Sequence, residues 1–144
     1  MTNRLDSQLE FLLEADKLRQ VERANLILDC SRCENSAEHS WHLALYAFVL
    51  APLAAPSVDI SRVIKMLLLH DLVEIDVGDH PINVATDWDS VAQAEQVAAK
   101  RIFSLLPDDQ GAEMLILWQE FEANQTPDAR FAKQLDRCQP VFQT

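Results

Sequence analysis

The stretch Met66–Asp76 is an apolar segment that abruptly carries polar side chains. In helical periodicity His70 continues the apolar stripe that begins at Val63 and should face the core, and Glu74 lies one turn beyond on the same face. A buried carboxylate beside an imidazole is costly unless something compensates it, and a bound cation does so well. Because adjacent helical residues diverge by roughly 100°, one ion can take a nitrogen of His70 and an oxygen of Asp71. The alternative is a hydrogen-bonded core histidine, with both carboxylates exposed.

Two further segments offer ligands to the same ion. His39 and His42 are three residues apart, hence on one face of a helix, and either could share an ion with His70. Asp136 interrupts the apolar face of the last predicted helix. Mixed nitrogen and oxygen ligands suit one divalent ion of Mn, Co, Fe, Ni or Zn, and four protein ligands on a six-coordinate ion leave places for water and substrate.

The elements that must position these residues are predicted to be helices. The 144 residues are 49% apolar and 24% charged with only two glycines, which favours an all-α fold over a sandwich or a doubly wound sheet. Repeats and linkers are absent from the sequence, so we expect a single domain over 1–144, a bundle of about five to six helices. Apolar periodicity, capping residues, glycine and proline predict helices over Leu9 to about Arg23, Ser36–Leu50, Asp59 or Ser61 to Gly78, Ser90–Leu106, Ala112–Ala123 and Thr126–Pro140, with an irregular connection over Asn25–Glu34 and a loop over Asp79–Asp87.

Charge and cysteine content restrict the partners and the compartment. A net charge of −11 argues against a nucleic-acid polymer but not against a small phosphorylated substrate, because a bound cation reverses the local potential. We find no apolar run of membrane-span length and no signal-peptide pattern, so a cytoplasmic location without membrane attachment is expected. Cys30-Ser-Arg-Cys33 lacks a second pair and an adjacent predicted strand, which favours an incidental, reduced pair over a zinc or redox site.

The ordered set of polar residues resembles the HD-domain superfamily of metal-dependent phosphohydrolases. Glu38-His39-Ser, His70-Asp71-x-x-Glu74-x-x-x-Gly78-Asp79 and Lys133-Gln134-Leu135-Asp136 look like its 5′-deoxynucleotidase branch, over about 32–137. The bare His-Asp pair is weak evidence, whereas the ordered set with its Gly-Asp extension is strong.

This resemblance implies a helical HD-domain bundle in which His39, His70, Asp71 and Asp136 coordinate the metal. It also implies that Glu74 and Asp79 stand beside the ion as catalytic carboxylates. We assign to Glu74 the base that takes a proton from the attacking water, and to Asp79 the orientation of that water or protonation of the leaving 5′-oxygen. The expected substrate is a deoxynucleoside 5′-monophosphate.

Three residues are candidates for binding the substrate. Arg32, just before the first ligand, can clamp phosphate through its planar guanidinium, although a surface pair with Glu34 is an equal alternative. Arg23 is a weaker candidate, because arginines near helix ends are usually solvated. His42 can bind phosphate, with packing or hydrogen bonding as the alternative role.

Other functions remain open at this point. A related enzyme would hydrolyse another nucleotide or phosphorylated metabolite, a di-iron oxygenase would need more histidines, and a regulatory module would keep the ion for structure alone. The chain ends eight residues after Asp136, where relatives generally continue into another helix. We therefore expect apolar surface around Phe131 and Leu135, covered by a second subunit in a homodimer.

Overall fold

Helices dominate the computed structural model, which describes residues 3–79 and 87–143. Within these residues, six α-helices have ten or more residues, and a short antiparallel hairpin is the remaining regular element besides short helical turns. In chain order the elements are α1 (Arg4–Ala15), the 3₁₀-helix η1 (Asp16–Gln20), β1 (Glu22–Leu26), β2 (Cys33–Asn35), α2 (Ser36–Leu50), the 3₁₀-helix η2 (Ala51–Leu53), α3 (Ile60–Leu69), α4 (Glu74–Val77), α5 (Trp88–Phe103), α6 (Asp108–Ala123) and α7 (Pro127–Phe142). The predicted all-α class is confirmed.

Local side-chain caps explain where most of these helices begin. Asn35 and Glu38 form the predicted capping box at the start of α2, each accepting a hydrogen bond from the other's backbone N–H. Asp59 caps α3, and Thr126 caps α7, whose first residue is Pro127. The capping box sets the start of α2 and so places His39 near the beginning of that helix.

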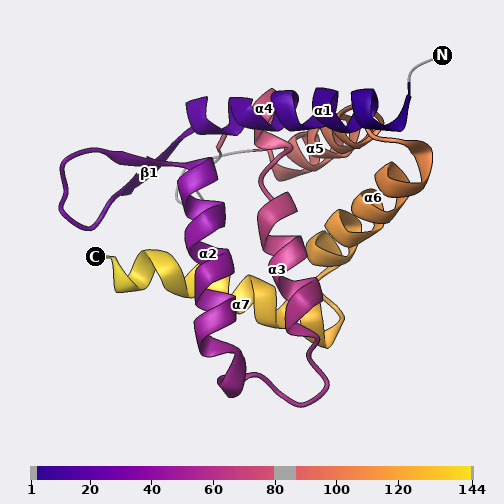
Figure 1. Ribbon diagram of the computed structural model, residues 1–144. Helices are drawn as coiled ribbons and strands as arrows, with labels where there is room; N and C mark the ends of the chain where they lie inside the picture. Colours follow the sequence, from indigo (N-terminus) through magenta and orange to yellow (C-terminus); the bar gives the residue numbers. More distant parts are fainter. Residues whose placement is uncertain (1–2, 80–86, 144) are drawn as a thin grey trace.

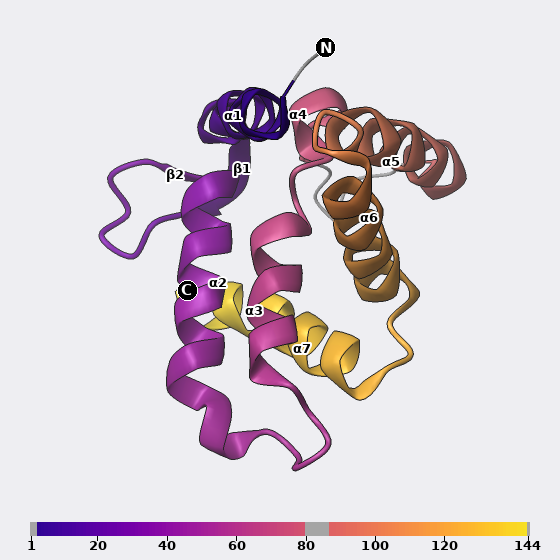
Figure 2. The same ribbon diagram turned by 45° about the vertical axis from the view of Figure 1, so that its right-hand side comes forward.

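The helices that matter for the site form one layered arrangement (Figure 1). α2 and α3 lie side by side, and α7 crosses against both of them. α6 packs against α3 and α7, while α1 lies across one end of the molecule, near α4 and α5 (Figure 2). Segments far apart in the sequence, namely the start of α2, the end of α3 and the second half of α7, therefore meet in the interior.

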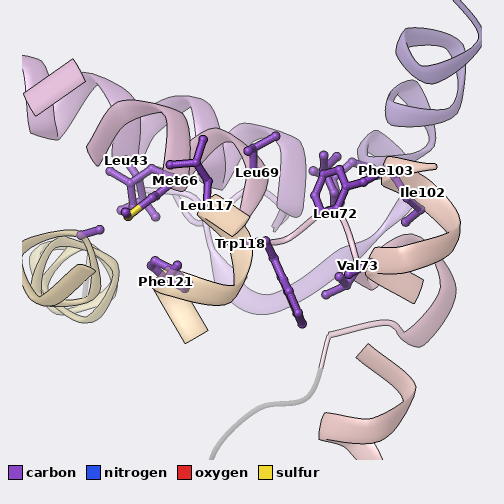
Figure 3. Packing of buried hydrophobic residues seen from close by; sticks show 14 of the residues in the cluster. Leu43, Met66, Leu69, Leu72, Val73, Ile102, Phe103, Leu117, Trp118 and Phe121 are labelled. Atoms are coloured by element: carbon purple, nitrogen blue, oxygen red, sulfur yellow. The ribbon is translucent and has the colours of Figure 1, made fainter. Parts of the chain in front are cut away.

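The core is one continuous apolar cluster with side chains from α1 through α7. Met66 of α3 packs near Leu43 of α2 at one end, and Trp118 of α6 lies near Val73 toward the other (Figure 3). Trp118 is 1% exposed and anchors this core, whereas Trp41 is 62% exposed. In the described part of the chain, no helix combines the length and the hydropathy needed to cross a membrane.

The predicted continuous helix through Met66–Asp76 is wrong, because the structure divides this stretch between two helices. α3 ends at Leu69, and the backbone N–H groups of Leu72, Glu74 and Ile75 bond to carbonyl oxygens three residues earlier. This tighter, 3₁₀-like winding re-aims Glu74, which no longer follows His70 at α-helical spacing. α4 then ends as predicted at Gly78, whose φ of 82° favours glycine.

Three other boundaries also differ from the sequence-based expectation. α1 begins at Arg4 instead of Leu9 and ends at Ala15, and the 3₁₀-helix η1 continues only to Gln20, short of the predicted Arg23. The segment predicted as irregular contains a β-hairpin with Cys30 at φ 63° in its turn. α7 runs through Pro140 to Phe142, because a proline removes one helical hydrogen bond without forbidding a packed helix to continue. Most of the predicted loop, 80–86, lies outside the described residues.

Candidate metal centre

His70 presents a buried, unpartnered nitrogen at the end of α3. Its Nδ1 donates to the carbonyl oxygen of Leu67 at 2.6 Å, since a carbonyl can only accept. Its Nε2 has no hydrogen-bond partner and lies 3.2 Å from Oδ2 of Asp71 and 3.7 Å from Oδ1 of Asp136. The imidazole is thus held by one nitrogen and aims the other at two carboxylates.

His39 reaches the same point from α2. Its ring is fully buried, and its Nε2 lies 2.7 Å from Oδ1 of Asp136 on α7. The rings of His39 and His70 have centroids 5.8 Å apart. One ligand atom from each of His39, His70 and Asp136 lies within 4.8 Å of the others, so three helices converge on one small volume.

The residues present fit a divalent cation. Oδ2 of Asp71, like Nε2 of His70, is buried without a hydrogen-bond partner, and unpaired buried polar atoms are costly. Two imidazoles and two carboxylates are also a donor set that Mn²⁺, Co²⁺, Fe²⁺, Ni²⁺ and Zn²⁺ accept. A cation among these four side chains would satisfy the orphaned atoms and offset the carboxylate charges.

The electrostatics of the cluster reflect this concentration of opposite charges. Burial lowers the pKa of His70, but the negative charges of Asp71 and Asp136 outweigh it and hold that pKa well above its ordinary value. The pKa of His39 is raised for the same reason, with burial opposed by its contacts to Asp136 and Glu34. The pKa of Asp136 is lowered strongly, because the two imidazoles outweigh its burial.

Glu74 and Asp79 lie at the edge of the cluster. Glu74 is buried, and its Oε2 accepts a hydrogen bond of 2.6 Å from Oγ of Ser36. Burial, followed by the charge of Asp71, raises the pKa of Glu74 to about 9. Asp79 is connected to the cluster through Arg23, whose Nη1 lies 3.8 Å from Asp79 and 3.7 Å from Asp71.

The two candidate arginines occupy different environments. Arg23 lies on β1, not at a helix end as expected, and only 13% of its side chain is exposed beside the cluster. Arg32 is 54% exposed and forms a two-pronged ion pair with Glu38, at 2.9 and 2.6 Å. The sequence-based argument that Arg23 is solvated is therefore wrong, and so is the alternative pairing of Arg32 with Glu34.

His42 makes packing and hydrogen-bonding contacts, which was the alternative to phosphate binding. Its Nδ1 lies 3.2 Å from Nε2 of Gln139, and its ring stacks on Trp41 and meets Tyr46 edge-on. On its other side it lines a surface hollow of about 380 Å³ together with Tyr46 and Phe142. These contacts support a structural role.

Sequence reasoning missed three residues around the cluster, namely Ser36, Glu34 and Gln139. All three are polar and at most 2% exposed. Gln139 stands one helical turn after Asp136, so its spacing alone places it on the same face of α7. Glu34 directly precedes the cap of α2, a position that gave no such signal.

In this all-α fold, three helices bring together a histidine, a His-Asp pair and a distant aspartate, which defines a helical domain of the His-Asp type. The chain belongs to the HD-domain family, because the family model described as "HD domain" matches residues 15–144.

Named relatives agree with this membership. Human 5′-deoxynucleotidase HDDC2 is 30% identical over 95% of this chain and 66% of its own length, and the mouse protein of the same name is 30% identical over 94% and 67%. The chain thus spans about two thirds of these curated relatives. A crystal structure of a predicted metal-dependent phosphohydrolase from Magnetospirillum magnetotacticum MS-1 is 52% identical, with a TM-score of 0.93 over 97% of this chain and 70% of that one.

Proposed function

We propose that this chain is a metal-dependent phosphohydrolase that releases phosphate from a small phosphomonoester, with a deoxynucleoside 5′-monophosphate as its substrate. The observation that carries the proposal is the convergence of His39, His70 and Asp136 from three helices, with unpartnered atoms of His70 and Asp71 among them. The names of the 5′-deoxynucleotidase relatives support the substrate class.

In this proposal His39, His70, Asp71 and Asp136 hold one divalent ion per chain. When bound, the ion supplies Lewis-acid polarisation of the phosphoryl group and lowers the pKa of water toward neutrality. The chain's own carboxylates then handle the protons. The charge of a bound cation would lower the raised pKa of Glu74, so that this carboxylate would take the proton of the attacking water. The hydrogen bond from Ser36 orients the carboxylate for that transfer.

Arg23 is the residue we assign to the phosphate group. Its guanidinium already faces the carboxylates of Asp71 and Asp79, and a planar guanidinium matches phosphate in the same way. Asp79, held against Arg23, orients the attacking water or protonates the leaving 5′-oxygen. Arg32 and His42 are engaged elsewhere and receive no part in the reaction.

Phosphate release from a panel of esters tests the proposal. Metal-stripped protein is assayed with deoxynucleoside and nucleoside 5′-monophosphates and other phosphorylated metabolites, with and without added Mn²⁺ or Co²⁺. We expect metal-dependent release with a preference for deoxynucleotides. A preference for another ester would support the related phosphohydrolase, and no release from any ester would overturn the proposal.

Glu74→Gln separates catalysis from a purely structural ion. We expect it to bind metal like the wild type while turnover falls by about 10²–10⁴-fold, the usual contribution of a general base. Glu113→Gln, on the exposed face of α6, is the matched control. Joint loss of metal and fold in Glu74→Gln would favour the regulatory module.

Three properties of the whole chain stay proposals, namely a single domain over 1–144, a cytoplasmic location and a homodimer. The residues that motivated the dimer do not support it, because Leu135 is 5% exposed and Phe131 packs against the core. Exposed apolar side chains lie instead on other faces, such as Leu13 of α1, Phe48 of α2 and Phe142 at the end of α7. Light scattering that detects only a monomer would remove the dimer.

A further inference from the structure

Gln139 is a fully buried amide whose polar atoms all face other side chains. Its Nε2 donates to Oε2 of Glu34 at 2.8 Å and lies 3.2 Å from Nδ1 of His42. Its Oε1 lies 3.1 Å from Nδ1 of His39. The side chain on α7 therefore joins β2 to two histidines of α2, immediately behind the candidate metal centre.

The hydrogen-bonding chemistry of this group fixes its orientation. The carboxylate of Glu34, which faces Arg23, can only accept, so the NH₂ of Gln139 must point to it. The amide oxygen is then left for His39, whose Nδ1 must donate to it. Gln139 thus keeps a proton on Nδ1 of His39 and turns Nε2 toward Asp136.

Glu34 extends the same arrangement to Arg23. Its Oε1 lies 3.3 Å from Nε of Arg23 and 3.3 Å from Nδ1 of His39, which are ion-pair distances without a hydrogen bond. Glu34 is 2% exposed, so water does not compete for these contacts. One buried carboxylate therefore faces both the side chain assigned to the metal and the side chain assigned to phosphate.

We propose that Glu34 and Gln139 are positioning residues that hold His39 and Arg23 in a single geometry, so that the metal ligand and the phosphate-binding arginine are set by one buried hydrogen-bonded pair. The proposal rests on the roles that the proposed function gives to His39 and Arg23. Groups that fix a metal-bound histidine through its other nitrogen change metal affinity by about 10–100-fold when they are removed.

Gln139→Met removes the amide while nearly keeping its volume. We expect the dissociation constant for Zn²⁺, measured by chelator competition on metal-stripped protein, to rise by about 10–100-fold. Gln134→Met, the same change at an exposed position of α7, should leave it unchanged. Circular dichroism and thermal melting verify the fold of both variants.

Glu34→Gln probes the other half of the pair. The new amide oxygen can still accept from Gln139, but the charge that faces Arg23 is lost. We expect the KM for the phosphate ester to rise by about tenfold, as for a lost charged contact, with a smaller effect on Zn²⁺ affinity. An equal loss in Zn²⁺ affinity and in affinity for the phosphate ester would contradict the assignment of Glu34 mainly to Arg23.

A spectroscopic signal tests the orientation of His39 itself. Long-range ¹H–¹⁵N correlation spectra of the Zn²⁺-loaded wild type should show a protected proton on Nδ1 of His39, and Gln139→Met should expose it to faster exchange. If Gln139→Met fails to fold, an unprotonated or unprotected Nδ1 in the wild type still overturns the inference.

The two proposals fail in different ways. A wild type that binds no Zn²⁺ would overturn the proposed function and, with it, the positioning role. A wild type that binds Zn²⁺, together with Gln139→Met of equal affinity and an equally protected Nδ1 proton, would overturn the positioning role alone.

Discussion

Nε2 of His39 lies 2.7 Å from Oδ1 of Asp136, although 97 residues separate them in the sequence. The contact exists because α7 crosses α2, and a third helix, α3, brings His70 to the same oxygen at 3.7 Å. The candidate centre is therefore a product of helix packing, and any change that displaces α7 should reduce metal binding.

Asp136→Asn should abolish high-affinity metal binding while the fold is kept. The substitution removes the one anionic ligand contributed by α7, and 30% of the side chain is exposed, so the amide can be solvated. We expect the dissociation constant for Zn²⁺ to rise by at least about 100-fold, the upper end of the effect of outer-shell changes, with a matching loss of phosphate release. Asp89→Asn serves as the control, and wild-type affinity in Asp136→Asn would exclude this residue as a ligand.

Arg23→Lys and Arg32→Lys distinguish the two arginines. A lysine at position 23 keeps the charge but loses the planar pair of donors, so we expect the KM for the phosphate ester to rise by about tenfold with little change in kcat. Arg32→Lys should stay near wild type, because its present partner is Glu38. The reverse pattern in steady-state kinetics would restore the sequence-based preference for Arg32.

Gly111→Ala should destabilise the contact between α5 and α6. A Cβ at this position would clash with the carbonyl oxygen of Phe103, a backbone atom that cannot move aside cheaply. We expect a loss of about 1–3 kcal/mol in the free energy of unfolding, as for other overpacked sites. Urea denaturation measures it, with Glu113→Ala in the same turn region as control, and equal stability of the two variants would contradict the packing.

Glu95 should make the stability of the protein depend on pH. Burial, followed by the charges of Glu122 and Asp71, raises the pKa of Glu95 from 4.5 to about 7, while Lys133 opposes the rise. Because the folded pKa lies above the unfolded one, the unfolded state binds fewer protons between these values, and stability falls as the pH rises through this window.

Glu95→Gln removes that ionisation and tests its sign. Since one pKa unit corresponds to about 1.4 kcal/mol and the side chain is partly exposed, we expect the variant to gain on the order of 1–2 kcal/mol over the wild type between about pH 5 and pH 8. Urea unfolding at both pH values measures the gain. A difference in the free energy of unfolding between variant and wild type that does not change with pH would show that folding does not raise the pKa of Glu95.

Local rules predicted much of this fold from the sequence. Asn35, Asp59 and Thr126 begin helices because their side chains satisfy free backbone N–H groups, a short-range effect that sequence spacing reveals. Gly78 ends α4 because its positive φ suits glycine. The order of His39, His70 and Asp136 also pointed to one centre, through resemblance to a known family.

Tertiary interactions decided the features that the sequence did not reveal. The break after Leu69 is a change to tighter winding in a buried segment, and no glycine or proline marks it in the sequence. Arg23 looked solvated because its strand could not be recognised. The pairing of Glu34 with Gln139 spans 105 residues, so only the crossing of the helices brings it about.

Anomalous diffraction at the zinc edge, from crystals of the Zn²⁺-loaded protein, tests the central claim most directly. The account predicts one peak per chain, bonded to Nε2 of His39 and of His70 and to oxygens of Asp71 and Asp136 at roughly 2.0–2.2 Å. A map without a peak between these side chains, or with its only peak out of reach of Asp136, would contradict the account.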